Sequence, residues 1–288
     1  LDRFPFVTKI YKRYLNLYNY RQTSLRYPYI DLYSSRGCPH YKCIYCVFPR
    51  SLQGKPSYRC RSIRNVMDEL WHVHDYIPEV KQVYFQDDTL TEKRMRDIAQ
   101  AILDEGLKIC WGGECRPEIS YETLKLAKES GLRTLQVGYE VPITKHLKII
   151  EKGTTVEQIT EFAKNIRKLK IWTSMSLMIF PWMTPDEIRF MIRWAKRMRP
   201  TRINLMMAIP YPNTPFYELM RRFEWLKTAG YEIAPKLMSK EEMLRWERWG
   251  FKQFYVYNPR FWWHVLTHPS EWRQVLKDAL GLWRFITG

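Results

Sequence analysis

The chain has 288 residues, of which 45% are hydrophobic and 15% aromatic, and 47 Lys and Arg against 30 Asp and Glu give a formal charge of +17. These fractions are typical of a folded globular protein and exclude wholesale disorder and low-complexity fibres. The length suits one large α/β domain or two small ones. No run of about 18 uncharged apolar residues occurs, so we expect no membrane-spanning helix.

Hydrophobic periodicity predicts that strands and helices alternate from residue 29 onwards. In chain order we expect a strand over Tyr29–Ser34, a helix over Ser62–His74, a strand over Val80–Phe85, a helix from Thr91 closed by Gly106, a strand over Leu107–Trp111, a helix over Tyr121–Ser130, a strand over Thr134–Tyr139, a helix over Thr155–Leu169, a strand over Ile171–Phe180, a helix over Pro185–Met198 and a strand over Arg202–Ala208. Parallel strands need long crossovers, so this alternation predicts an α/β fold, a partial (β/α)6 TIM-like barrel.

The pattern changes from about residue 223. Six tryptophans lie interleaved with Arg and Lys, and no β/α unit is evident: Trp246, Trp249, Trp262, Trp263, Trp272 and Trp283. We expect a helical C-terminal extension that packs on or beside the barrel. The predicted domains are a lead-in over residues 1–27, a barrel core over 28–222 and this extension over 223–288. The chain begins with Leu1 and has no signal-peptide pattern, so we expect a segment or a processed chain.

Polar residues follow the predicted strands. They are the cysteine loop after the first strand, Asp87 and Asp88, Glu114 and Arg116, Glu140, and Tyr211. Chemistry in β/α folds gathers at the carboxyl ends of the strands. The shared position of these residues therefore predicts a site at that rim.

Three of the six cysteines, Cys38, Cys43 and Cys46, fall within nine residues. Disulfide frameworks belong to small secreted domains, so this crowding indicates metal ligation. A closed zinc site needs four ligands, and Cys38, His40 or Cys60 could complete the Cys43–Cys46 pair only with strain. An iron–sulfur cluster is the better interpretation, because three thiolates on a four-iron cluster leave one iron open for catalysis.

The remaining cysteines, Cys60, Cys110 and Cys115, are too scattered to predict a second cluster. We expect Cys110 in the core, and Cys115 on the rim is a residue to test.

The cysteine loop resembles that of the radical S-adenosylmethionine (SAM) enzymes, in which three close cysteines follow the first strand of a partial barrel and an aromatic residue, here Tyr45, precedes the last. The spacing departs from the family's C-x3-C-x2-C pattern and is C-x4-C-x2-C. The resemblance extends over Pro28 to Arg222. Three segments are similar to segments of the subgroup that also binds cobalamin: QVYFQDDTLTEKRM, LQVGYEVP and AIPYPNTPFYELM. The C-terminal segment QFYVYNPRFWWHVL is similar to the tails of the same subgroup. This subgroup includes hopanoid-biosynthesis-associated members.

Three segments depart from the subgroup's pattern. Val141 replaces the Ser of its GxES segment, Asn213 replaces the Gly of its PYPGT segment, and its GLPGET segment is altered to Ile179-Phe180-Pro181-Trp182-Met183-Thr184.

The resemblance implies a 4Fe-4S cluster on Cys38, Cys43 and Cys46 whose open iron chelates SAM. One electron, from a donor such as a flavodoxin or ferredoxin, then releases a 5′-deoxyadenosyl radical. Cobalamin would bind through an N-terminal domain that usually precedes the barrel and is absent from this chain.

Five further residues are candidates for SAM binding, each with an ordinary alternative. Tyr45 would pack on the adenine, or in the core. Asp87 and Asp88 would meet the SAM ammonium, or cap the helix from Thr91. Arg116 suits the SAM carboxylate, or a surface ion pair. Glu140 would accept hydrogen bonds from the ribose hydroxyls, or form a salt bridge.

Three functions follow as hypotheses. The first is a cobalamin-linked enzyme that methylates or rearranges an unactivated carbon of a lipid or other apolar small molecule, cytoplasmic with peripheral contact at the inner membrane face through the Trp- and Arg-rich tail. The second is a tRNA- or protein-modifying radical SAM enzyme, with the positive charge serving a phosphate backbone; nucleic acid is the less favoured partner. The third is a non-catalytic iron–sulfur or zinc protein.

Overall fold

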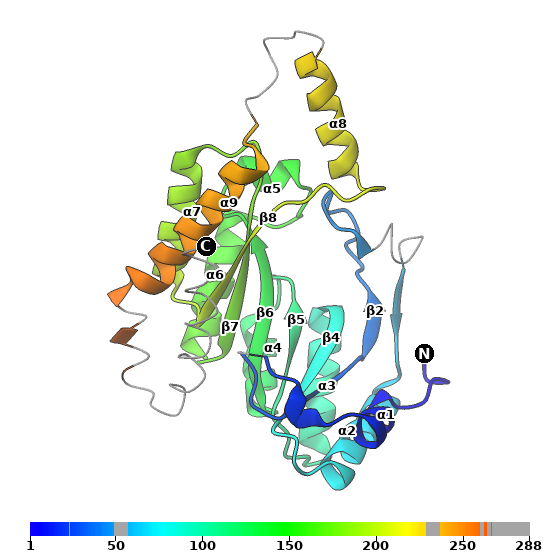
Figure 1. Cartoon of the computed structure of the whole chain (residues 1–288). Coiled ribbons are helices and arrows are strands. Elements are labelled where there is room, and N and C mark those ends of the chain that lie inside the picture. The colour runs from blue at the N-terminus through cyan, green and yellow to red at the C-terminus, as the bar shows by residue number, and fades with distance from the viewer. Residues whose placement is uncertain (23, 49–56, 229–236, 260–261, 264–265, 267–288) are drawn as a thin grey trace.

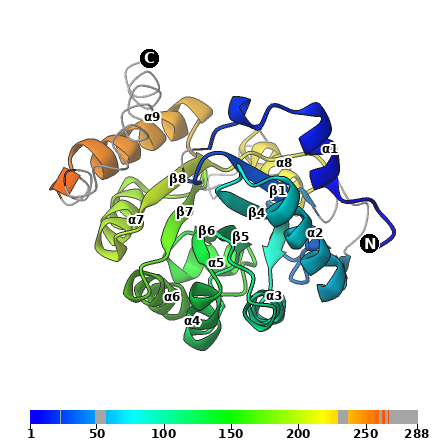
Figure 2. The ribbon, with the colours of Figure 1, turned by 90° about the horizontal axis from the view of Figure 1, so that it is seen from below.

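The computed structural model describes residues 1–22, 24–48, 57–228, 237–259, 262–263 and 266. Its centre is a sheet of six parallel strands in sequence order. They are β1 (Tyr29–Leu32), β4 (Gln82–Leu90), β5 (Trp111–Cys115), β6 (Leu132–Glu140), β7 (Trp172–Ile179) and β8 (Arg202–Met207). Seen from below, the strands form an arc with helices on its outer side, and β1 and β8 are its two ends (Figure 2). The expected partial barrel is confirmed.

The outer helices begin at Ser or Thr residues whose side chains accept a hydrogen bond from the first turn. The helices are α2 (Ile63–Tyr76), α3 (Glu92–Asp104), α4 (Tyr121–Glu129), α6 (Val156–Lys168) and α7 (Pro185–Met198), and the caps are Ser62, Thr91, Ser120, Thr155 and Thr184. Each helix turns an apolar face to the sheet, as the periodicity predicts. Together they bury the outer face of the strands.

β5 and β4 differ most from the predicted strands, and the other strands agree to within about two residues. β5 begins where the predicted strand 107–111 ends, because residue 107 still closes the turn after α3: the Leu107 N–H donates to the Ile102 carbonyl, 3.0 Å away. The observed strand contains Gly112 and Gly113, which have low β-propensity. A Cβ on Gly112 would lie 2.6 Å from the Thr134 carbonyl oxygen, so the close approach of β6 requires glycine there. β4 extends to Leu90 through an irregularity in its pairing with β5.

A short antiparallel pair brackets the cysteine loop. β2 (Ser35–Gly37) follows β1 directly and pairs with β3 (Tyr58–Cys60). Gly37 has a φ of +95°, and a Cβ there would lie 1.7 Å from the Ser57 carbonyl oxygen. The close pairing therefore requires glycine immediately before Cys38.

The remaining helices lie at the two ends of the barrel and beside it (Figure 1). They are α1 (Val7–Tyr14), a 3-10 turn (Leu17–Asn19), α5 (Thr144–Ile149), α8 (Pro215–Thr228), α9 (Lys240–Phe251) and a π-helical turn (Lys252–Val256). α9 packs along β8 and α7. The Tyr255 hydroxyl accepts from the Ile203 N–H at 2.9 Å and donates to its carbonyl at 3.0 Å, which satisfies the β8 edge.

The C-terminal extension is thus helical over residues 240–256, where Trp246 and Trp249 pack edge to face with ring centres 5.3 Å apart. Trp262 and Trp263 are exposed, and Trp272 and Trp283 lie outside the described residues. None of the helices in the described ranges has the length and apolarity of a membrane span.

Candidate active site

The cysteine loop lies at the carboxyl end of the barrel, between the segment after α5 and the start of α8. The Ile44 N–H donates to the Ile150 carbonyl at 3.2 Å, and the Ile44 carbonyl accepts from the Phe216 N–H at 3.0 Å. A turn from the Cys46 N–H to the Cys43 carbonyl closes the loop at 3.2 Å. These bonds fix the backbone between the second and third cysteines.

The three thiols of the loop are electrostatic neighbours. Burial raises the pKa of Cys46 to about 11, and thiolates at Cys43 and Cys38 add to this shift. Burial also acts to raise the pKa of Cys43, but a hydrogen bond from His40 and the charges of Lys152 and Arg116 outweigh it, so that its pKa is lowered. Cys43 is therefore better prepared to ionise than Cys46.

The donor set fits a cluster better than a single ion. Among the described residues, no three His, Cys, Asp or Glu side chains converge closely enough to hold one metal ion. An iron–sulfur cluster does not need such convergence, because each thiolate binds a different iron. The geometry therefore gives a mononuclear zinc site no support.

Three successive carbonyl oxygens after α5 hold the cysteine loop and Arg116. Ile150 accepts from the Ile44 N–H at 3.2 Å, Glu151 from His40 Nε2 at 2.8 Å, and Lys152 from an Arg116 Nη2 at 2.5 Å. The segment is shaped by Gly153, whose φ is +74° and where a Cβ would lie 2.6 Å from the His40 ring. The sequence analysis assigned no role to residues 150–153.

Arg116 lies against the cysteine loop. Its Nη1 is 3.9 Å from the Cys43 Sγ, its side chain is 12% exposed, and Glu118 accepts from its Nε at 3.2 Å. Arg116 therefore forms an ion pair, as the alternative to SAM binding predicts. The pair differs from a surface pair in that the guanidinium is largely buried.

Glu140 and Tyr45 meet next to the cysteines. Glu140 ends β6 with a φ of +61°, and its Oε1 lies 2.7 Å from the Nζ of Lys152. Burial raises the pKa of Tyr45 well above its usual value, and the charge of Glu140 and a hydrogen bond to it add to the effect. The Tyr45 ring also packs edge to face on Phe180 at 5.9 Å. Tyr45 thus packs on a core aromatic ring and Glu140 forms a salt bridge, the alternatives considered for them, and Glu140 lies against Tyr45 of the cysteine loop.

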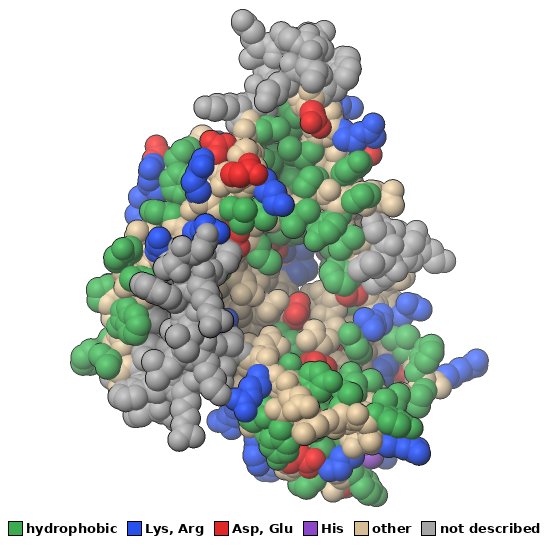
Figure 3. Space-filling model, viewed as in Figure 1, with side chains coloured by type: hydrophobic (Ala, Val, Ile, Leu, Met, Phe, Trp, Pro, Cys, Tyr) green, Lys and Arg blue, Asp and Glu red, His purple; other side chains and the backbone are tan. Residues whose placement is uncertain are grey.

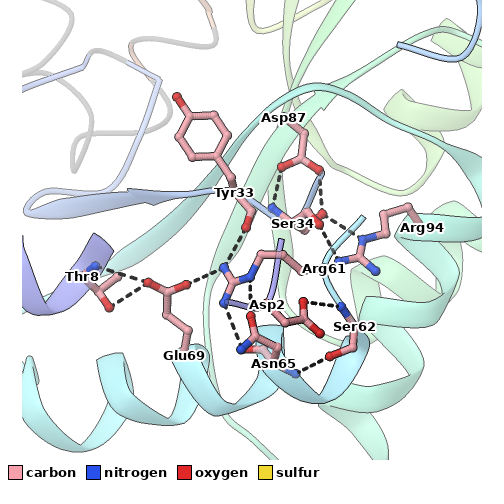
Figure 4. Close-up of polar contacts among 10 residues, drawn as sticks. All are labelled: Asp2, Thr8, Tyr33, Ser34, Arg61, Ser62, Asn65, Glu69, Asp87 and Arg94. Atoms are coloured by element: carbon pink, nitrogen blue, oxygen red, sulfur yellow. Dashed lines mark hydrogen bonds and ion pairs between the residues drawn. The ribbon is translucent and has the colours of Figure 1, made fainter. Parts of the chain in front are cut away.

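Asp87 and Asp88 have different surroundings, since successive side chains of a strand point to opposite faces. Asp87 is 1% exposed and accepts from the Ser34 N–H at 2.7 Å and the Ser34 hydroxyl at 2.6 Å, while Arg94 of α3 donates to Ser34 (Figure 4). The Ser35 hydroxyl donates to Asp87 as well, at 2.5 Å. Asp88 is half-buried and accepts from the Gly37 N–H at 2.6 Å, next to Cys38.

Neither aspartate caps α3. Its N-cap is Thr91, whose side chain accepts from the Arg94 N–H at 3.2 Å. The capping alternative is therefore wrong for both, because β4 continues past them to Leu90 and places them in the strand.

Sequence reasoning missed Asp31, Gln86 and Gln136 on the inner face of the sheet, and it expected Glu114 after its strand, whereas Glu114 lies within β5. Asp31 and Gln86 lie 3.3 Å apart, and Glu114 and Gln136 pair in register with 3.4 Å between their side chains. Figure 3 shows this face hollowed, with acidic side chains inside the hollow. Two-residue alternation with the buried Ile30, Leu32, Val83 and Phe85 is the signal that would have found Asp31 and Gln86.

The ionisation of Glu114 is expected to make stability depend on pH. Burial raises the pKa of Glu114 from 4.5 to about 7, and the charges of Asp88, Asp31 and Asp87 add to the shift. As pH rises from about 4.5 to 7, the unfolded chain releases this proton while the folded chain retains it, so the folded state loses up to about 3 kcal/mol. We expect Glu114→Gln to remove this loss and to be more stable than the wild type at pH 8.

Urea unfolding of both proteins across this pH range measures the difference in their free energies of unfolding. Carboxyl groups far from Glu114 contribute equally to both proteins, so their contributions cancel in this difference. Parallel curves for the two proteins would contradict the prediction.

We expect the Glu140–Lys152 ion pair to require glycine at position 138, because the pair occupies the space that a side chain there would need. A Cβ at this position would lie 2.6 Å from the Glu140 Oε1 and 3.0 Å from the Lys152 Nζ. We expect Gly138→Ala to lower the free energy of unfolding by about 1–3 kcal/mol, the usual cost of overpacking. The same change in a Glu140→Ala background should cost less, because the nearest atom is gone. Equal costs in the two backgrounds, measured by urea unfolding, would rule out this explanation.

The chain is similar to known proteins in sequence and in structure. The sequence profile of the radical SAM superfamily matches residues 32–195. An uncharacterized methyltransferase of Pyrococcus horikoshii is 31% identical over 241 residues, which are 80% of this chain and 52% of that protein. An anaerobic magnesium-protoporphyrin IX monomethyl ester cyclase of Cereibacter sphaeroides is 25% identical over 77% of this chain and 38% of its own length. The chain thus spans about half or less of these relatives.

Two solved structures share the fold. One is the cobalamin-dependent SAM radical enzyme OxsB, with a TM-score of 0.61 and 17% identity over 85% of this chain and 45% of that one. The other is the radical SAM methyltransferase TsrM of Kitasatospora setae, with a TM-score of 0.59 and 20% identity over 68% of this chain and 39% of that one. With its profile match extending over more than half of its residues, the chain belongs to the radical SAM superfamily.

Proposed function

We propose that this chain is the SAM-cleaving part of an enzyme that methylates or rearranges an unactivated carbon. Radical SAM enzymes use a 4Fe-4S cluster and SAM, and they need a reductant and a substrate. The observation that carries the proposal is the neighbourhood of Cys38, Cys43 and Cys46 at the barrel rim, with a guanidinium 3.9 Å from the middle thiol. In this arrangement the three thiolates hold the cluster.

When bound, the cluster supplies the electron that cleaves SAM and produces the 5′-deoxyadenosyl radical. The protein orients SAM and excludes water. We assign the SAM carboxylate to Arg116, the ribose to Glu140, the adenine to Tyr45 and the ammonium to Asp88. Asp87 is the weakest of our candidates, because its carboxylate already accepts three hydrogen bonds from Ser34 and Ser35.

The methyl-transfer reaction is supported by the names of the relatives. The relative from Pyrococcus horikoshii is called a methyltransferase, and OxsB is called cobalamin-dependent. We therefore include cobalamin as a second cofactor of the whole protein and assign none of the residues described here to it. The net charge of +17 favours an acidic electron donor such as a flavodoxin or ferredoxin.

The substrate is best sought among small molecules that combine an unactivated carbon with hydrogen-bond donors. The inner face of the sheet carries the carboxyl groups of Asp31 and Glu114, which Gln86 and Gln136 contact at 3.3 and 3.4 Å. A carboxyl group can accept further hydrogen bonds, so this face suits a substrate with donors better than a wholly apolar one. A lipid with a polar headgroup meets this requirement, and exposed Trp262 and Trp263 are consistent with peripheral membrane contact. Flotation with anionic lipid vesicles, compared with salt-dependent retention of tRNA, distinguishes this hypothesis from the nucleic-acid alternative.

The test of the central proposal is anaerobic reconstitution of the full chain with iron and sulfide. We expect about four irons for each chain, a broad visible absorbance and, after reduction with dithionite, conversion of SAM to 5′-deoxyadenosine. Zinc as the sole bound metal, or a cluster that never cleaves SAM, would overturn the proposal and favour a non-catalytic metal protein.

A further inference from the structure

A buried lysine lies beside the cysteine loop. The side chain of Lys152 is 6% exposed, and its Nζ lies 2.7 Å from the Oε1 of Glu140, which is 7% exposed. Lysine is almost never buried this completely unless it is paired. The segment that follows β6, which includes α5, brings Lys152 back to the end of the same strand, so that the ammonium reaches Glu140, the last residue of β6.

Gly138 provides the space for this ion pair. A Cβ there would overlap both the Glu140 carboxylate and the Lys152 ammonium, at 2.6 and 3.0 Å. The carboxylate therefore folds back over its own strand rather than extending away from the barrel. Lys152 holds one of its oxygens, and the Tyr45 hydroxyl also hydrogen-bonds to the carboxylate. The two oxygens of a carboxylate have about four lone-pair sites, so Glu140 can accept further hydrogen bonds.

The backbone of Lys152 holds a second residue of the site. Its carbonyl oxygen accepts a hydrogen bond from Arg116 at 2.5 Å, and Arg116 Nη1 lies 3.9 Å from the Cys43 Sγ. Lys152 thus contacts both residues to which we assign opposite parts of SAM. Its side chain fixes the proposed ribose acceptor, and its main chain fixes the proposed carboxylate donor.

We propose that Lys152 is a positioning residue for SAM. Its ammonium orients the Glu140 carboxylate, and its carbonyl sets the distance between that carboxylate and the Arg116 guanidinium. The inference rests on the proposed function and adds to it a residue that acts through Glu140 and Arg116 without touching the reacting atoms. Residues that hold metal ligands in place change affinity or activity about 10–100-fold when they are replaced, and we expect an effect of this order here.

The test compares SAM affinity among variants of the reconstituted full chain. Lys152→Met keeps the length and the carbonyl but removes the ammonium, and we expect the Kd for SAM to rise at least about tenfold with the iron content unchanged. Lys152→Arg restores a cation and should recover part of the affinity. Lys148→Met, an exposed lysine nearby, should bind SAM as the wild type does.

A double-mutant cycle separates positioning from general stability. If Lys152 acts through Glu140, the Lys152→Met change should raise the Kd much less in a Glu140→Gln background than in the wild type. Equal SAM affinity of Lys152→Met and the wild type would overturn the positioning role and leave the proposed function intact. Additive effects, or equal losses of iron and thermal stability in Lys152→Met and Lys152→Arg, would assign Lys152 to folding alone. A reconstituted wild type that binds no SAM would instead refute the proposed function.

Discussion

Replacement of Cys43 by alanine is expected to abolish SAM cleavage and to lower the iron content after reconstitution. Cys43 is buried, and the charges of Arg116 and Lys152 favour its thiolate. Alanine removes one of three protein ligands, and no other cysteine of the loop is available to replace it. We expect formation of 5′-deoxyadenosine to fall more than about 100-fold, beyond the effect of losing a residue that merely supports a ligand.

Matched controls are provided by the cysteines outside the loop. Cys60 is exposed on β3, and Cys110 is half-buried just before β5. Cys60→Ala and Cys110→Ala should retain iron and activity close to those of the wild type. The proposed ligand set is refuted if Cys43→Ala keeps its iron and its activity, or if Cys60→Ala loses them to the same extent.

Replacement of Glu69 by glutamine is expected to destabilise the fold by about 3–5 kcal/mol, the usual cost of breaking a buried ion pair. Glu69 on α2 is 1% exposed and pairs with the Nη1 of Arg61 at 2.5 Å. Its other oxygen accepts from the N–H and the hydroxyl of Thr8 on α1, at 3.2 and 2.9 Å (Figure 4). Glutamine would leave the Arg61 charge buried without its counter-charge.

This network also supports the entry to the cysteine loop. Arg61 donates to the Tyr33 carbonyl at 2.8 Å, immediately before Ser34 and β2. Urea unfolding measures the loss of stability. The exposed Lys12–Glu79 pair is the control: its side chains are 48% and 27% exposed, and Glu79→Gln should cost less than about 1 kcal/mol. Similar losses for the two variants would show that burial does not govern the strength of these pairs.

The outer half of the fold could be predicted from local patterns. Apolar residues repeat with helical spacing in each outer helix, and a Ser or Thr stands at the start of each, so the predicted helices agree with α2, α3, α4, α6 and α7 to within a few residues. The prediction was weakest at β5, where Gly112 and Gly113 have no side chains to show a pattern. Glycine is required at these two positions because neighbouring strands approach closely, and this approach is a property of the folded sheet that the local sequence does not show.

In the candidate site, too, some residues could be predicted from local sequence and others could not. The cysteine spacing and the positions at the strand ends predict Cys38, Cys43, Cys46, Arg116 and Glu140 as site residues. Sequence reasoning did not distinguish Asp87 from Asp88, because their difference depends on the continuation of β4 and on the hydroxyls of Ser34 and Ser35. Lys152 also escaped notice, since a single lysine in a loop carries no pattern until the loop folds back onto Glu140.

Local patterns in the sequence are enough to predict a parallel β/α barrel with three closely spaced cysteines after its first strand. Periodicity, caps and cysteine spacing are local properties, written in residues that are close together in the chain. Which charged groups lie near these cysteines depends on the folded chain, because Arg116, Glu140 and Lys152 come from separate segments that meet only in the barrel. A buried charge is stable only when its partner lies within a few ångströms, and that distance exists only after the barrel has closed around the pair.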